Sequence, residues 1–256
     1  MTDAAAPHLR PTTLLDFGHP SLRLLIETRE WRNLPERERI GAVYAFVRDE
    51  VAFGYNASDD LRASAVLGEG RGQCNTKTIL LMALLRGTGI ACRFHGATIH
   101  KSLQKGVVTG LFYRLAPDNI LHSWAEVLFE GRWLPLEGVI LDKAYLAGVR
   151  CLVSPGAQAL LGYGVGTDRM ASPEIDWRGE ATWIQSTGIN GDFGTFDDPD
   201  TFYSRHGANL SGFRGFLFRH LVRHIMNLRV RRIRRRSETS GNHPGRSHSG
   251  AEPRPT

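Results

Sequence analysis

The sequence has few cysteines and no long apolar run. Three of its 256 residues are cysteine, and their spacings match neither a disulfide framework nor a zinc site. The ten histidines show no metal-ligand spacing with cysteines or acidic residues, so we expect no metal or cofactor. No apolar stretch approaches the roughly 18 residues of a membrane span, and the first residues lack the apolar core of a secretory signal. We therefore expect a soluble, cytoplasmic protein.

Acidic residues are missing from one segment near the end of the chain. Residues 211–236 hold nine arginines and no aspartate or glutamate. The whole chain carries a net charge of +6 and residues 237–256 are neutral, so removing those nine charges leaves −3 for residues 1–210. The basic character is therefore local, and the body of the protein is mildly acidic.

Apolar residues in the basic segment 211–236 follow helical spacing, which predicts an amphipathic helix. Three interpretations are open: the apolar stripe docks on the body, the helix lies on an anionic membrane, or the arginines bind nucleic-acid phosphates without sequence preference. We favour docking, because a long apolar stripe is seldom left in water. The end of the helix, Arg231–Arg236, would then stay available for an anionic membrane or a polyanion.

One cysteine stands at a predicted helix start. A glycine-rich loop precedes Cys74, and Ile79–Leu85 is apolar throughout, which predicts a buried helix. The unpaired N–H groups and the dipole of a helix start favour a thiolate over a thiol. Cys74 is therefore a candidate nucleophile. Free cysteines are more often small core residues, and this is our interpretation of Cys92 and Cys151. Whether Cys74 is a nucleophile therefore depends on whether a base lies beside it.

Helical patterns precede and follow Cys74, and strand patterns come after them. Residues 91–99 and 111–115 are predicted strands, and residues 122–129 and 132–137 are predicted to form a hairpin. Residues 148–209 show no sustained periodicity and are predicted to be long loops with a short helix after Asp198. Helices first and an antiparallel sheet afterwards predict an α+β fold, with the buried cysteine-bearing helix packed on the sheet.

The hairpin brings a histidine and a carboxylate to one face of the sheet. A two-residue turn at Glu130–Gly131 pairs Phe129 with Arg132, and this register makes His122 and Glu137 diagonal neighbours. Diagonal neighbours lie about 7–8 Å apart, within reach of an imidazole and a long carboxylate.

Two other carboxylates are less suited to hold this histidine. Glu126 shares the face, but four residues along a strand is roughly 13 Å. Asp142 lies beyond the hairpin and is the reserve candidate. With Glu137 as the acidic member, Cys74 would attack an acyl carbon and His122 would accept and return its proton, while the carboxylate would orient the imidazole.

Three segments carry a family resemblance. Gly72–Cys74 followed by Leu80–Arg86 resembles the cysteine segment of the transglutaminase-like superfamily. His122–Val127 resembles its histidine segment, usually His-Ala-Trp-x-Glu-Val, and Gly131–Glu137 resembles its third segment, which usually ends in aspartate. The three follow one another in the order of the family.

The resemblance implies a papain-like α+β fold with Cys74 as nucleophile, His122 as base and Glu137 as the acidic member. It would cover a catalytic domain of residues 13–210, followed by the basic helix 211–236. Residues 1–12 and 237–256 are predicted to be disordered tails. Glu137 is a departure from the family pattern, because its side chain is one bond longer than aspartate.

These observations predict a cysteine acyl enzyme acting on an amide, peptide or glutamine-like carboxamide through a Cys74 thioester. The expected substrate is a peptide or protein amide, with hydrolysis favoured over transfer because water is always available as acceptor. Protease, amidase and transglutaminase are not separated. The alternative is a non-catalytic transglutaminase-like module that binds a partner and uses its basic end as a surface anchor.

Overall fold

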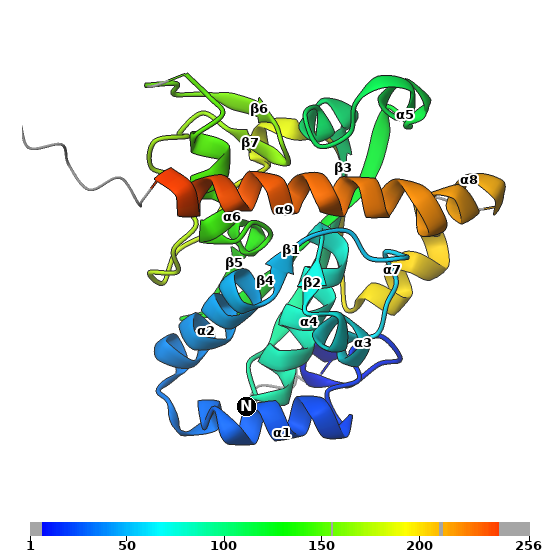
Figure 1. The fold of residues 1–256 in the computed structure, drawn as a ribbon. Helices are drawn as coiled ribbons and strands as arrows, with labels where there is room; N and C mark the ends of the chain where they lie inside the picture. Colours follow the sequence, from blue (N-terminus) through cyan, green and yellow to red (C-terminus); the bar gives the residue numbers. More distant parts are fainter. Residues whose placement is uncertain (1–6, 155, 210–211, 241–256) are drawn as a thin grey trace, which may run out of the picture.

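A computed structural model describes residues 7–154, 156–209 and 212–240, and all structural statements concern these residues (Figure 1). The helices are α1 (Pro20–Thr28), α2 (Glu36–Ala45), α3 (Ala63–Glu69), α4 (Cys74–Gly87), α5 (Gly110–Leu115), α6 (Lys143–Arg150), α7 (Pro199–His206), α8 (Gly212–Leu217) and α9 (Arg223–Ser240). The strands are β1 (Ala52–Phe53), β2 (Arg71–Gly72), β3 (Cys92–His100), β4 (Asn119–Phe129), β5 (Arg132–Pro135), β6 (Leu160–Gly162), β7 (Val165–Thr167) and β8 (Ile189–Phe196).

Helix α4 is the centre of the molecule. Every one of its residues is buried, as the apolar run after Cys74 predicts. A capping box between Gln73 and Thr76 closes its first turn and satisfies backbone donors there. One turn further, the buried Lys77 Nζ donates to two backbone carbonyls, those of Arg48 and Ile140, at 2.9 and 3.0 Å. Burial lowers the pKa of Lys77 to about 7. The start of α4 is therefore fixed from several sides.

An antiparallel sheet in the order β5-β4-β3-β8 packs on α4. The α+β fold and the packing of the cysteine-bearing helix on an antiparallel sheet are thus confirmed. The hairpin between β4 and β5 has the predicted register, with Phe129 opposite Arg132. Both turn residues have positive φ, 48° at Glu130 and 75° at Gly131, the backbone that a two-residue hairpin turn requires.

The hairpin ends earlier than its sequence pattern predicts. β5 stops at Pro135, and Glu137–Val139 forms a short 3₁₀ turn. Glu137 is therefore no strand neighbour of His122, and it reaches the histidine from the turn.

Two further predictions are wrong. Residues 110–115 form the helix α5 where 111–115 are predicted to be a strand. The segment predicted to be loops contains β8, the outer strand beside β3. β8 pairs through two register shifts, carries glycines at 191 and 194, and is largely exposed, so it lacks the alternation of a half-buried strand.

The C-terminal helices dock on the body (Figure 1). A π-helical turn, Phe218–Val222, joins α8 to α9, and α9 crosses the front of the molecule over α6. Met226, Val230 and Ile233 are buried and belong to the main core. At Gly148 of α6 a Cβ atom would lie 2.0 Å from the carbonyl oxygen of Ile233, so only glycine permits this contact.

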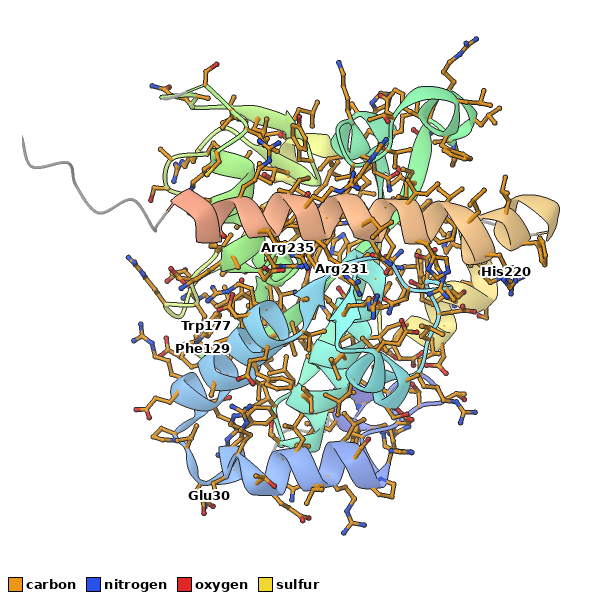
Figure 2. All side chains as sticks on the ribbon, viewed as in Figure 1. Glu30, Phe129, Trp177, His220, Arg231 and Arg235 are labelled. Atoms are coloured by element: carbon orange, nitrogen blue, oxygen red, sulfur yellow. The ribbon has the colours of Figure 1, made fainter. Side chains whose placement is uncertain are left out.

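The predicted free arginine end, Arg231–Arg236, is partly built into the core. Arg234 Nη2 lies 2.6 Å from Asp142 Oδ2 and donates to the carbonyl of Phe53 at 3.0 Å. Arg231, Arg232 and Arg235 are exposed. Figure 2 labels Arg231 and Arg235, which are four residues apart and therefore share one face of α9.

The predicted boundaries at both ends need correction. Residues 7–12 are not a disordered tail, because the carbonyl of Arg10 accepts a bond of 2.8 Å from Arg86 and Thr12 donates to Asp200. Helix α9 continues past 236 to Ser240. The rest of the two predicted tails, 1–6 and 241–256, lies outside the described residues. Within the described part of the chain, no helix has both the length and the apolar character needed to cross a bilayer.

Candidate active site

The site forms where β4 runs past the end of β5. β5 pairs only with residues 126–129, so the backbone edge of Leu121 and Ser123 has no strand beside it. Polar side chains take the place of that strand: Asn75 Nδ2 donates to the carbonyl of Leu121 at 3.1 Å, and Thr78 Oγ1 to that of Ser123 at 3.1 Å. The N–H of Leu121 donates to Asn209 Oδ1 at 2.5 Å. These bonds hold the first turn of α4 against the open edge of β4.

Cys74 lies at this junction, 9% exposed, and lines a cavity. Burial raises the pKa of the Cys74 thiol, and the negative charge of Asp59 adds to this effect. Backbone N–H groups of Asn75 and Ser123 hydrogen-bond to the thiol and act in the opposite direction. The balance corrects the expectation from the helix start alone: desolvation outweighs the amides, and the resting group is a thiol.

His122 follows the same edge and is fully buried. Its Nε2 lies 3.4 Å from Glu137 Oε1, and its ring centroid lies 5.7 Å from that of Trp124. The next residue on the strand, Ser123, directs its backbone N–H toward the thiol of Cys74.

Glu137 is also fully buried, and two backbone amides hold its carboxylate. The N–H of Gln185 donates to Oε1 and Oε2 at 3.0 Å each, and the N–H of Ile184 donates to Oε2. Amide donors stabilise a buried carboxylate and fix its orientation. One oxygen of Glu137 is thereby presented to the His122 ring.

The two other carboxylates weighed from the sequence bind elsewhere. Asp142 caps α6 through the N–H of Tyr145 and pairs with Arg234. Glu126 accepts from His95 and Arg93, each at 2.7 Å. The structure therefore brings together His122 and Glu137, and keeps Glu126 and Asp142 out of the site.

Sequence reasoning missed residues that complete the site. Asp59 accepts a bond from Gln73 Nε2 at 3.2 Å and sets part of the charge around the thiol. Gln185 supplies an amide to Glu137 and is one of the residues lining the cavity that Cys74 also lines. Asp59 lies in polar turn material and Gln185 in a segment without periodicity, so no sequence signal marked either. Among the described residues, no cluster of three or more histidines, cysteines and acids can hold a metal ion.

Comparison with known families agrees with the three sequence segments. Residues 27–138 match the model of the transglutaminase-like superfamily, and Cys74, His122 and Glu137 all lie within the match. The resemblance carried by the three sequence segments is confirmed over this stretch. It indicates chemistry based on a cysteine.

Among solved structures, the chain is similar to a crystal structure described as a "putative cysteine protease" from Cytophaga hutchinsonii. The two share 14% sequence identity at a TM-score of 0.45, over 78% of this chain and 49% of the other. The chain thus spans about half the length of that protein. No curated protein matches the chain.

Proposed function

We propose that the chain is a cysteine hydrolase of transglutaminase-like type that cleaves an amide through a thioester on Cys74. The observation that carries the proposal is the buried pair of His122, on β4, and Glu137, in the 3₁₀ turn, with Nε2 and Oε1 3.4 Å apart. A buried imidazole beside an oriented carboxylate is the arrangement that activates a thiol or hydroxyl nucleophile.

In this mechanism the thiol loses its proton as it attacks. Because burial raises the pKa of Cys74, a thiolate is not the resting form. His122 takes the proton while sulfur adds to the acyl carbon, and it returns the proton to the leaving amine. Since Nε2 faces Glu137, Nδ1 is the ring nitrogen assigned to the thiol. The amides of Asn75 and Ser123, which reach the sulfur, are also placed to stabilise negative charge that develops there.

Water completes the reaction by attacking the thioester, with His122 as base. Hydrolysis is the proposed direction because water needs no binding site of its own, whereas transfer needs a pocket for an acceptor amine. Protease and amidase differ only in the leaving amine, and the proposal covers both.

Acylation by p-nitrophenyl acetate tests this assignment without knowledge of the substrate. After an acid quench, peptide mass spectrometry should find the acetyl group on Cys74, and His122→Asn should abolish that adduct. The exposed Cys151 is an internal control, because its slow background acetylation should not depend on His122. Equal acetylation of both thiols, unaffected by His122→Asn, would falsify the proposal.

A second candidate is a non-catalytic binding module. The raised pKa of Cys74 favours it, because a buried protonated thiol is the usual state of a structural cysteine. In that case the exposed Arg231, Arg232 and Arg235 of α9 would supply the contact with an anionic membrane or polyanion. The acylation experiment separates the two, since only the enzyme needs His122 for its reaction with Cys74.

A further inference from the structure

The thiol opens on a cavity of about 580 Å³, a size typical of small-molecule sites. Its walls come from distant parts of the chain: the residues after β1, the ends of β3 and β4, the helix α5, and the C-terminal helices α8 and α9 with the turn between them. Figure 1 shows α5 and α8 at the same end of the molecule. The docked C-terminal segment is therefore a wall of the site.

Polar lining gathers around the thiol. Gln73 and Asn209 both donate to Asp59, and Asn75 is bonded to β4. Gln185 is 4% exposed, and its Nε2 donates to the carbonyl of Gly164. Its Oε1 has no partner within the described part of the chain, although it is a buried acceptor.

The rest of the cavity is mainly aliphatic and aromatic. The walls away from the thiol include Val108, Phe112, Leu115, Leu217, Phe218 and Val222. Such a surface favours hydrocarbon and offers few partners to polar groups.

The apolar surface continues outside the cavity. Leu115 lines it and is 56% exposed, so this residue stands at the mouth. Leu111 on the same helix is exposed as well, and so are Phe216 and Leu221, which belong to the C-terminal elements that supply other lining residues. Exposed apolar residues grouped around an opening mark a binding site more often than scattered ones do.

We infer that the acyl group of the substrate is an aliphatic chain, and that the enzyme cleaves an N-acyl amide of this kind. The inference rests on the proposed function and names its substrate class. The Cys74 sulfur bonds to the acyl carbon, the C–N bond breaks, and the amine leaves with the thiol proton carried by His122. Water then cleaves the thioester, which releases the carboxylic acid and restores the thiol.

A peptide is a poor occupant of the same cavity. Each residue of a peptide brings one N–H and one C=O that need partners when buried. Away from the thiol the walls are mainly hydrocarbon, so those groups would lose hydrogen bonds to water without replacement. A hydrocarbon chain carries no such cost, and its burial is favourable.

A series of aminomethylcoumarin amides with acetyl, butanoyl, hexanoyl and octanoyl groups tests the inference. Each added methylene should raise kcat/KM about fourfold until the cavity is filled. A peptidyl amide with a small side chain next to the scissile bond should react no faster than the acetyl compound. If the peptidyl amide is cleaved far faster than the octanoyl amide, or if rates do not depend on chain length, the inference is wrong.

Variants at the mouth of the cavity test whether the dependence of kcat/KM on chain length arises there. Leu115→Glu should reduce the ratio of octanoyl to acetyl kcat/KM at least tenfold, because it places a charge where the chain enters. Leu24→Glu is the matched control, since Leu24 is an equally exposed leucine on α1, outside the cavity lining. It should leave the ratio unchanged. If both variants have the same effect, the mouth is not the chain site.

A binding measurement separates this inference from the proposed function. Cys74→Ala cannot turn over, but it should bind a dansyl-labelled octylamide, and octanamide should displace the probe. If octanamide displaces the probe but the wild-type protein shows no turnover that depends on Cys74, the chain site is supported and the catalytic proposal is refuted. Turnover without displacement, and without dependence on chain length, would refute the chain site alone.

Discussion

Two carboxylate–histidine pairs lie on this sheet, and they differ in what surrounds them. His95 uses both ring nitrogens, with Nδ1 2.7 Å from Glu126 and Nε2 2.8 Å from Asp192. Its ring stacks on Trp124 at 4.1 Å between centroids. His122, near the other side of Trp124, has only Glu137 beside Nε2.

This difference suits His95 to a structural role and His122 to the role of a base. A base must keep one nitrogen free for the proton that it accepts, and the ring of His95 has none to spare. Glu126 is further neutralised by Arg93, whose Nη2 lies 2.6 Å away. The first pair is a closed ion network, whereas Nδ1 of His122 has no hydrogen-bond partner within the described part of the chain.

The largest expected effect is at the open pair. Glu137→Gln should reduce kcat/KM on the order of 10³-fold, because a neutral amide no longer stabilises the protonated imidazole. Thermal unfolding would show whether the protein still folds, since the amides of Ile184 and Gln185 also lose a charged acceptor. A fully active Glu137→Gln protein would show that the Glu137 carboxylate does not support His122 in the reaction.

A smaller effect is expected at the closed pair, and on a different property. Glu126→Gln should lower the free energy of unfolding by roughly 1–3 kcal/mol, since it leaves buried partners of a charged network poorly satisfied, while kcat/KM should hardly change. Urea denaturation and the acylation assay measure the two quantities on the same preparations. Loss of activity without loss of stability would mean that the roles of the two pairs are exchanged.

The smallest effect is a pH dependence. Burial alone would lower the pKa of His95, but its bonds to Glu126 and Asp192 raise it above the usual 6.5. A raised pKa adds stability that is complete below 6.5 and is lost as pH rises through the folded value. The difference in unfolding free energy between wild type and His95→Gln should therefore shrink as the pH is raised above 6.5. A difference that grows over this range would contradict the ion network.

The sequence predicts those parts of the molecule that local chemistry determines. The apolar run after Cys74 predicts a buried helix, and the Glu130–Gly131 turn predicts the hairpin register. The strand β8 was not predicted from the sequence, because it pairs with a strand that is distant in the chain and the pairing contains two register shifts. The hairpin register predicted His122 and Glu137 as neighbours, and the family resemblance indicated the same two residues. Their contact depends on the 3₁₀ turn at Glu137, which the strand pattern does not contain.

The amides that bind the Glu137 carboxylate come from outside the stretch that matches the family. The family match ends at residue 138, yet Ile184 and Gln185 lie more than 40 residues later. A fragment that keeps Cys74, His122 and Glu137 but ends with the match would carry a buried acid with no fixed orientation. Cys74, His122 and Glu137 are therefore not sufficient by themselves to form the site. An insertion or deletion after residue 138 that displaced Ile184 and Gln185 would release the Glu137 carboxylate without altering any of the three named side chains.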